Sequence, residues 1–254
     1  MEARRIDFTG KTALVTGGSR GLGLALAEAF AAQGARVAVC GRKQENLDRA
    51  VQECKGRGLE LLAHPAHMGK ADQVDALFTA VREAFGRLDI LVNNVGMNLP
   101  TPSTAEVAEG LWDKILEGNL KSAFLGSGRA VPLMKEQGGG RIVNISSVAA
   151  RKATRGMGVY CVAKAALEMY TRVLAAELAV DGIRVNAVAP GMVRTGFSEP
   201  FWGNEALLEQ ITASIPMGRI AETGDVVGAV LFLCSPWADY ITGEVVTVDG
   251  GSIL

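Results

Sequence analysis

The amino-acid sequence predicts an α/β protein built on a doubly wound sheet of seven mainly parallel strands, with helices on both faces. Short apolar runs rich in Val and Ile alternate with helix-like patterns along the chain, and this order is typical of a parallel sheet covered on both sides. The length of 254 residues lies at the upper end of one domain. A glycine-rich turn also follows the first expected strand, as in doubly wound folds that bind dinucleotides. Because seven expected strands at this length suggest one sheet, we expect a single domain over residues 1–254.

Seven apolar runs and six helical patterns give the expected elements. The strands are predicted at residues 11–16, 36–40, 59–65, 88–93, 141–146, 184–188 and 244–249. The helices are predicted at residues 21–33, 44–57, 71–85, 104–137 with a break near Gly118, 159–179 and 225–234. One long irregular stretch remains at residues 191–218. Because long connections in compact α/β chains often have a function, we expect it to form a substrate lid.

Charge, hydropathy and cysteine spacing exclude several functions. The 26 basic and 27 acidic side chains give a net charge of −1, which does not favour binding to nucleic acid or anionic lipid. The longest apolar run, residues 226–234, is too short for a membrane span. Neither histidine has metal-ligand spacing, so no catalytic metal is expected. The four cysteines lack CxxC spacing, and no signal-peptide pattern begins the sequence, so the expected location is cytoplasmic.

A glycine-rich segment, Thr16-Gly17-Gly18-Ser19-Arg20-Gly21-Leu22-Gly23, joins the first expected strand to the first expected helix. Its glycines permit a sharp turn and close approach of the backbone to a ligand, and the helix N-terminus favours a pyrophosphate. This is the context of a Rossmann-type dinucleotide site. The alternatives are a glycine loop without a ligand and a P-loop at residues 10–12, for which Arg5 stands where a glycine is required.

The choice of cofactor depends on the end of the second expected strand. It reads Cys40-Gly41-Arg42-Lys43, without the carboxylate that NAD enzymes commonly use to hold the ribose 2′-hydroxyl. Arg42, Lys43 and Arg20 could instead surround a 2′-phosphate, because a guanidinium binds phosphate through two parallel hydrogen bonds. We therefore expect NADP(H) rather than NAD(H). The alternative is that these basic side chains are solvated surface charge.

Tyr160 and Lys164 are four residues apart in an expected helix and therefore share one face. A nearby ammonium stabilises a phenolate, whose ordinary pKa is near 10. Lowering that pKa by about 3 units takes roughly 4 kcal/mol, which a desolvated lysine together with a cationic nicotinamide could supply. Tyr160 could then exchange a proton with a substrate oxygen near neutral pH. The alternative is that Tyr160 is an amphipathic core residue.

Ser147 ends the fifth expected strand, at the carboxyl edge where α/β sheets bind ligands. Its hydroxyl could hold a carbonyl oxygen toward Tyr160. The adjacent Ser146 is expected to point to the opposite face, because side chains alternate along a strand. The alternative for Ser147 is a helix or turn cap.

These motifs together resemble the short-chain dehydrogenase/reductase family over essentially the whole chain. The matching segments are residues 16–23, 93–96, 119, 147, 160–164, 190–191 and 249–251. Residues 67–71 and 240–244 look like the tropinone-reductase-like and carbonyl-reductase/retinol-dehydrogenase branches. The resemblance implies homotetramers or homodimers that pack through their long helices.

The resemblance also implies a role for each matching residue. Tyr160 would be the general acid/base, Lys164 would lower its pKa and bind the nicotinamide ribose, and Ser147 would hold the carbonyl. Asn119 would anchor a water that relays protons through Lys164. Beyond the glycine turn, the cofactor would be contacted by Arg42, Met68, Asn93, Gly96, Tyr160, Lys164, Pro190, Gly191, Val193 and Thr195.

Two positions depart from the family pattern. Val95 replaces the alanine of the Asn-Asn-Ala-Gly motif and adds volume beside the cofactor. His67 replaces the usual acidic residue after the third strand. The backbone of Met68 can still reach adenine, whereas the His67 side chain either contacts adenine or has a surface role.

The sequence therefore predicts an NADP(H)-dependent oxidoreductase that interconverts a ketone or aldehyde and an alcohol by hydride transfer. One alternative is a catalytically silent NADP-binding regulatory protein. Another is a sugar-nucleotide epimerase of a longer related family, which would favour a GxxGxxG turn and a larger C-terminal domain.

The substrate pocket is predicted from apolar and basic residues in and near the lid. Phe197, Phe201 and Trp202 in the lid and residues 97–99 after the fourth strand suggest a mainly apolar pocket, unless the aromatic residues fill a subunit interface. Arg151 and Arg155 could meet an anionic group or be solvated.

Overall fold

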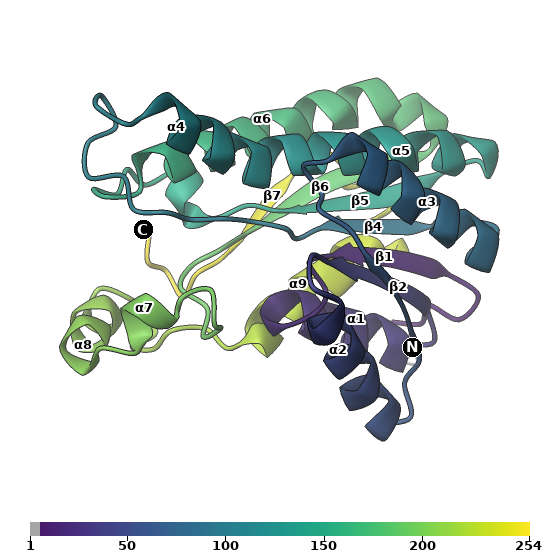
Figure 1. The fold of residues 1–254 in the computed structure, drawn as a ribbon, viewed down its shortest axis with the longest axis horizontal. Helices are drawn as coiled ribbons and strands as arrows, with labels where there is room; N and C mark the ends of the chain where they lie inside the picture. Colours follow the sequence, from purple (N-terminus) through teal and green to yellow (C-terminus); the bar gives the residue numbers. More distant parts are fainter. Residues whose placement is uncertain (1–5) are drawn as a thin grey trace.

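The chain folds around one parallel sheet, shown in Figure 1 for residues 6–254, which are the residues that this computed structural model describes. The strands are β1 (Thr12–Thr16), β2 (Arg36–Gly41), β3 (Leu61–Pro65), β4 (Ile90–Asn93), β5 (Gly140–Ile145), β6 (Ile183–Pro190) and β7 (Val245–Val248). Their order across the seven-stranded sheet is β3-β2-β1-β4-β5-β6-β7, with parallel pairing throughout. The predicted doubly wound α/β fold is confirmed.

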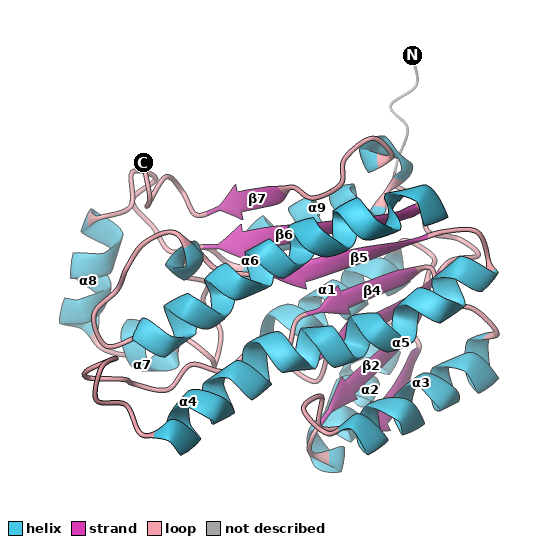
Figure 2. Cartoon of the chain, turned by 90° about the horizontal axis from the view of Figure 1, so that it is seen from above, coloured by secondary structure: helices cyan, strands magenta, loops and turns pink. Residues whose placement is uncertain are grey.

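Two layers of helices cover the sheet. The helices are α1 (Gly21–Ala32), α2 (Gln44–Gly56), α3 (Ala71–Phe85), α4 (Glu109–Leu116), α5 (Ser122–Glu136), α6 (Gly158–Leu178), α7 (Glu199–Trp202), α8 (Glu205–Ala213) and α9 (Thr223–Cys234). One face carries α1, α2 and α9, and the other carries α3 to α6 (Figure 1). α7 and α8 lie beyond the ends of the strands (Figure 2).

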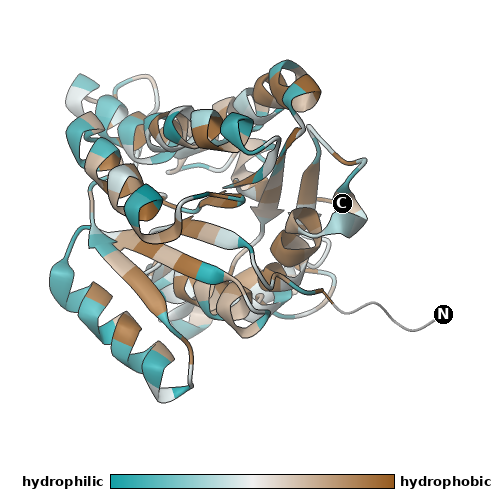
Figure 3. Cartoon of the chain, turned by 90° about the vertical axis from the view of Figure 1, so that its right-hand side faces the viewer, coloured by the Kyte–Doolittle hydropathy of each residue, from teal (hydrophilic) through white to brown (hydrophobic). Residues whose placement is uncertain are grey.

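Successive residues of each strand pack into opposite layers. Leu14 and Leu91 belong to the core beneath α3, α5 and α6, whereas Val15 and Val92 belong to the core beneath α1, α2 and α9. Figure 3 shows mostly apolar strands between helices that also carry hydrophilic residues. Because the sheet is covered on both faces, its strands are nearly continuous apolar runs, which is why the sequence predicted them.

The helix predicted over residues 104–137 differs from the structure at its start and near Gly118. Residues 102–108 are not helical, and α4 begins at Glu109. Near Gly118 the regular α-helix is interrupted as predicted, but by a π-helical turn at Glu117–Lys121 that joins α4 to α5. Such a turn inserts one residue into a helix without ending it.

The lid, residues 191–218, is not the irregular stretch that the sequence analysis predicts, since it contains α7 and α8. The side-chain oxygen of Asn204 accepts a hydrogen bond from the Leu207 backbone N–H at 3.1 Å and caps α8. This cap and the apolar residues at helical spacing behind it are the signal that the sequence analysis missed. The name lid is kept below for these residues.

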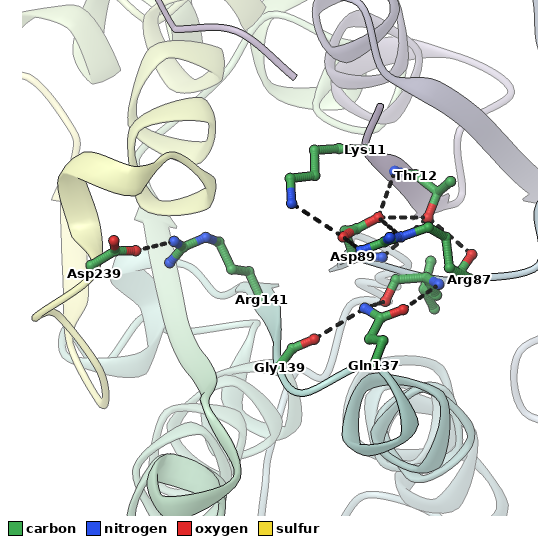
Figure 4. Close-up of polar contacts among 9 residues, drawn as sticks. Lys11, Thr12, Arg87, Asp89, Gln137, Gly139, Arg141 and Asp239 are labelled. Carbon is green, nitrogen blue, oxygen red and sulfur yellow. Dashed lines mark hydrogen bonds and ion pairs between the residues drawn. The ribbon is translucent and has the colours of Figure 1, made fainter. Parts of the chain in front are cut away.

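A buried aspartate ties the amino ends of β1 and β4 together (Figure 4). Asp89 Oδ2 accepts hydrogen bonds from the Thr12 backbone N–H at 3.0 Å and from Thr12 Oγ1 at 3.1 Å. Arg87 donates to both carboxylate oxygens at 2.9 and 2.6 Å. Burial opposes ionisation, but the bonds from Arg87 and Thr12 outweigh it and hold the pKa of Asp89 below its ordinary value.

We expect Asp89→Asn to lower the free energy of unfolding by about 1–2 kcal/mol at pH 7, because Thr12 and the half-exposed Arg87 would lose a charged acceptor. The ionised carboxylate stabilises the fold above its unfolded pKa of about 3.9. That contribution is lost as the pH falls through the lowered folded pKa. Urea unfolding at pH 7 and at about pH 3 should therefore show a smaller difference between wild type and variant at the acid pH.

Asp75→Asn is the matched control, because Asp75 pairs with Arg129 on an exposed surface and such pairs contribute little. Equal losses of stability for the two variants would contradict the role given to Asp89.

Candidate functional site

The carboxyl ends of the parallel strands meet at one edge of the sheet. The glycine turn follows β1, residues 94–96 follow β4, Ser147 follows β5 and the lid follows β6. The lid helices α7 and α8 lie beyond this same edge (Figure 2). The structure thus gathers the residues predicted from separate motifs at one place.

The glycine turn has a backbone that glycine adopts readily. Gly17 and Gly21 have φ angles of 67° and 56°, in the left-handed region that disfavours other residues. A β-carbon at Gly23 would lie 2.3 Å from the carbonyl oxygen of Gly17. The first turn of α1 can therefore lie against the end of β1 only with glycine at position 23.

Two residues whose roles the sequence analysis did not identify hold this turn in place. Asn94 Nδ2 donates to the Thr16 carbonyl oxygen at 2.9 Å. Thr16 Oγ1 accepts from the Asn94 backbone N–H at 3.0 Å and donates to the Val92 carbonyl oxygen at 3.3 Å. The signal was the pair Asn93-Asn94, but the sequence does not show which side chain faces the turn.

The N-terminus of α1 fits an anionic group. Among the described residues, no side chain caps this end and no acidic residue lies in its first turn, so its N–H groups can bind a phosphate. Leu22 packs on the core beside α1. A β-carbon at Gly41, at the end of β2, would lie 3.1 Å from Ser19 Oγ. The bend after β1 therefore approaches the bend after β2, and the residues present fit a dinucleotide.

The basic side chains predicted near the ribose are at the surface. Arg20 stands at the N-cap of α1, while Arg42 and Lys43 follow β2, and all three are exposed. The Gly18 backbone N–H donates to the Cys40 carbonyl oxygen at 3.0 Å, which keeps the two strand ends together. Both ends can therefore present cationic groups to one ligand.

Tyr160 and Lys164 lie one helical turn apart on α6, and both are buried. The Ser147 side chain lies near enough to the Tyr160 hydroxyl to lower the pKa of that phenol. Lys164 Nζ donates to the Ile145 carbonyl oxygen at 2.8 Å and lies 5.7 Å from the centroid of the Tyr160 ring. The side chain of Ser146 instead donates to Glu168 at 3.2 Å, so the two serines point to different partners.

Ser147 also caps the short helical turn that follows β5, as the alternative reading of the sequence suggested. Its Oγ accepts a hydrogen bond from the Ala149 backbone N–H at 3.2 Å. Capping and contact with Tyr160 are compatible, because a hydroxyl has one hydrogen to donate and two lone pairs. The cap fixes the direction in which the Ser147 hydroxyl points.

The protein groups around Tyr160 raise its pKa. Burial raises the pKa of the Tyr160 phenol to about 12; the hydrogen bond from Ser147 opposes this rise, and the Cys161 thiol adds to it. Burial also lowers the pKa of Lys164 to about 8. Lys164 is not among the groups that shift the pKa of Tyr160, and desolvation is the largest cause of its rise. A lowering of this pKa by Lys164 together with a cationic nicotinamide stays a prediction. Any net lowering would require further positive charge, such as that of an oxidised nicotinamide.

Asn119 lies in the π-helical turn and is fully buried. Its Nδ2 donates to the carbonyl oxygens of Met97 and Ile115 at 2.7 and 2.8 Å, and its Oδ1 accepts from the Met97 backbone N–H at 3.2 Å. A β-carbon at Gly96 would lie 3.3 Å from Asn119 Oδ1 and 3.5 Å from Lys164 Nζ. Asn119 thus holds the loop after β4 beside Lys164 by hydrogen bonds. Its role in a water relay stays a prediction.

Asn93 and Met68 turn their side chains into the core. Asn93 Nδ2 donates to Ser127 Oγ at 3.1 Å and to Asn144 Oδ1 at 2.8 Å, and Met68 packs with residues of α3 and α5. A cofactor contact from either would therefore come from the backbone. His67 Nδ1 accepts from the Gly69 backbone N–H at 3.1 Å, so one ring nitrogen serves the local turn.

The first part of the lid reaches both halves of the site. The Thr195 side chain lies 3.5 Å from where a β-carbon of Gly21 would stand. The Phe197 ring centroid is 6.4 Å from that of Tyr160. At the base of the lid, Pro190 ends β6, and a β-carbon at Gly191 would lie 3.0 Å from Asp249 Cα.

The Arg151 guanidinium is hydrogen-bonded to other residues of the protein. It bonds Glu168 at 3.3 Å, Thr247 Oγ1 at 3.0 Å and the Val245 carbonyl oxygen at 3.3 Å. These bonds join the segment after β5 to α6 and β7, while the residue itself stays exposed. Arg155 is exposed.

The chain is similar to known proteins over nearly its whole length. The family model described as enoyl-(acyl carrier protein) reductase matches residues 17–252. Dehydrogenase/reductase SDR family member 4 from Bos taurus is 43% identical over 251 residues, which are 99% of this chain and 90% of that protein. The chain belongs to the short-chain dehydrogenase/reductase family. A tropinone reductase homologue from Arabidopsis thaliana is 42% identical over 249 residues, 98% of this chain and 94% of that protein.

A solved structure has the same fold over nearly the whole chain. The 7α-hydroxysteroid dehydrogenase complexed with NADH and 7-oxo glycochenodeoxycholic acid has a TM-score of 0.93 and 31% identity, and the match covers 97% of this chain and 95% of that chain. The family is one of oxidoreductases that bind a nicotinamide cofactor. Within residues 6–254, no helix combines the length and the apolar composition that crossing a bilayer requires.

Proposed function

We propose that this protein is an NADP(H)-dependent oxidoreductase that interconverts a ketone or aldehyde and an alcohol, with Tyr160 as general acid/base. The proximity of the Ser147 side chain to the buried Tyr160 phenol, whose pKa it lowers against the effect of burial, supports this proposal most directly. Both residues lie at the edge of the sheet where the glycine turn and the lid also lie. Such a pair can hold one carbonyl oxygen between them.

The proposed chemistry divides between the cofactor and the protein. A bound nicotinamide supplies or accepts the hydride. Ser147 holds the carbonyl oxygen, and Tyr160 gives that oxygen a proton during reduction. The raised pKa of Tyr160, about 12, keeps the phenol protonated at neutral pH, as a proton donor requires. In the reverse direction, the positive charge of an oxidised nicotinamide favours loss of this proton.

The substrate proposed is a small molecule whose carbonyl or alcohol group has an apolar neighbourhood. The Phe197 ring lies beside Tyr160, and Leu99 packs in the same apolar cluster as Tyr160. Apolar walls with a few convergent polar groups are the usual composition of a small-molecule site. The alternative of a silent NADP-binding regulator requires cofactor binding without turnover of any such substrate.

We expect Tyr160→Phe to lower kcat for carbonyl reduction by roughly 1,000-fold, because the proton donor is lost. The affinity for NADPH should change little, since the ring remains. A panel of ketones and aldehydes, followed by NADPH absorbance, measures the rates, and a fluorescence titration measures binding. Tyr240→Phe is the control, since Tyr240 is fully exposed. Near-full turnover by Tyr160→Phe would contradict the role of Tyr160, and a wild type that binds NADPH without reducing any of the panel would favour the regulator.

The proposed preference for NADP(H) depends on the exposed basic side chains at the ends of β1 and β2. One of them, Arg42, directly follows β2. We expect kcat/KM with NADPH to exceed that with NADH by about tenfold or more, since a charge-assisted hydrogen bond contributes about 1.5–3 kcal/mol. Arg42→Ala should reduce this ratio, mainly through KM for NADPH. Arg49→Ala, at an exposed position of α2, is the matched control. A wild type that prefers NADH would overturn the proposal.

We also propose that the protein forms a homodimer or homotetramer through α5 and α6. Four exposed apolar residues lie on these two helices: Phe124, Val162, Met169 and Val173. The helices run side by side on the outside of one layer (Figure 2), and the rings of Phe124 and Tyr170 meet edge to face at 6.4 Å between centroids. Exposed apolar patches of this kind mark interaction surfaces.

We expect the double variant Phe124→Glu, Met169→Glu to have a smaller assembled mass by light scattering than the wild type, because two carboxylates would be buried in the interface. The control is Val180→Glu, at an apolar position that is 90% exposed beyond the end of α6. A wild type that is monomeric, or a double variant with unchanged mass, would contradict the proposal.

A cytoplasmic location is also proposed. The four cysteines of the chain are free, and three of them are buried, which suits a reducing compartment. Fractionation of cells that express the native protein would test this location, and recovery outside the cytoplasm would overturn it.

A further inference from the structure

The backbone of Thr195 is held by residues that lie later in the lid. Thr195 stands beside the glycine turn, with its side chain 3.5 Å from where a β-carbon of Gly21 would lie. Its backbone N–H donates to Ser198 Oγ at 3.3 Å. Its carbonyl oxygen accepts from the indole Nε1 of Trp202 at 3.0 Å. The backbone N–H and the carbonyl oxygen of Thr195 therefore each have a hydrogen-bond partner among the side chains of the lid.

The Thr195 carbonyl oxygen accepts hydrogen bonds from two N–H groups, the Ser198 backbone N–H at 3.1 Å and the Trp202 indole N–H. Ser198 Oγ also lies 3.2 Å from this carbonyl, but it is nearer to the Val193 carbonyl oxygen. A hydroxyl has a single hydrogen to donate, and the shorter contact with Val193 takes it. Trp202 therefore supplies the side-chain hydrogen bond that, together with the one from the Ser198 backbone N–H, fixes the direction of the Thr195 carbonyl.

The Trp202 ring is itself held in place. The Arg194 guanidinium lies 5.2 Å from the centre of the ring, within the range of a cation–π contact. Arg194 Nε also donates to Glu222 at 3.0 Å, at the N-cap of α9. The Arg194 backbone N–H donates to the Ala221 carbonyl oxygen at 2.8 Å. One chain of contacts thus runs from α9 through Arg194 and Trp202 to Thr195.

We propose that Trp202 is a positioning residue for the nicotinamide end of the cofactor. It acts through Thr195, whose peptide it locks between the glycine turn and the catalytic tyrosine. The inference rests on the proposed nicotinamide-dependent function. The aromatic residues of the lid therefore divide into two roles: Phe197 lies against Tyr160, whereas Trp202 bonds the backbone of the lid itself.

The test is Trp202→Phe, which removes the indole N–H but keeps an aromatic ring beside Arg194. We expect KM and Kd for NADPH to rise roughly tenfold, because the Thr195 peptide must be ordered on binding. We expect kcat at saturating NADPH to change less than about threefold, because Ser147 and Tyr160 are untouched. Steady-state kinetics and a cofactor titration give both values. The midpoint of thermal unfolding should stay near that of the wild type, since α7 lies at the surface.

Two further variants sharpen the test. Arg194→Gln should raise KM for NADPH in the same direction by a few-fold, because it loosens the ring without removing the N–H donor. Trp237→Phe changes an exposed tryptophan far along the chain and should leave KM and kcat unchanged. Unchanged Kd and KM in Trp202→Phe, with a wild type that binds NADPH and turns over, would overturn this inference alone. A wild type that binds no nicotinamide dinucleotide would overturn both this inference and the proposed function.

Discussion

The hydrogen bond from the Lys164 ammonium to the Ile145 carbonyl oxygen sets the geometry of the site. A buried ammonium is unfavourable unless it has hydrogen-bond partners, so this bond constrains where α6 can lie on the end of β5. Ser147 follows Ile145 by two residues, and Tyr160 precedes Lys164 by one helical turn. Fixing the lysine therefore also fixes the distance between the serine and the tyrosine. Gly96 leaves room beside the ammonium, where a β-carbon would lie 3.5 Å from Lys164 Nζ and 3.3 Å from Asn119 Oδ1.

The burial that makes this arrangement rigid also disfavours charge on both of its titratable groups. The phenol of Tyr160 has its pKa raised and the ammonium of Lys164 has its pKa lowered, with desolvation as the main cause in each case. The protein thus contributes position, while much of the electrostatic stabilisation of a phenolate has to come from a bound cation. On the proposed function, the proton affinity of Tyr160 would change with the oxidation state of the nicotinamide.

The sequence was a good guide to features that depend on burial and on the parallel sheet. The strands were recognisable because they are apolar on both faces, and the site could be assembled from motifs that follow successive strands. The helices of the lid were missed because the aromatic residues of α7 were assigned to an irregular lid and because α8 has no buried residue. Orientation was also out of reach: Asn93 faces the core and Asn94 faces the turn. The pKa of Tyr160 depends on three-dimensional desolvation, which no residue spacing reports.

The π-helical turn between α4 and α5 has a consequence for how this long helix is compared with others. Each residue of an α-helix advances the side-chain direction by about 100°, and the extra residue of the turn shifts the angular phase of everything after Lys121. Ile115 and Asn119 share one inward direction, whereas Ala123 and Leu125 begin a second. A helical wheel drawn through residues 109–136 as a single α-helix would blur these two inward faces. Deleting one residue from the turn would give α4 and α5 the same angular phase. The two helices would then be rotated about their axis relative to each other, so that either Asn119 or the sheet-facing side of α5 would point in a different direction.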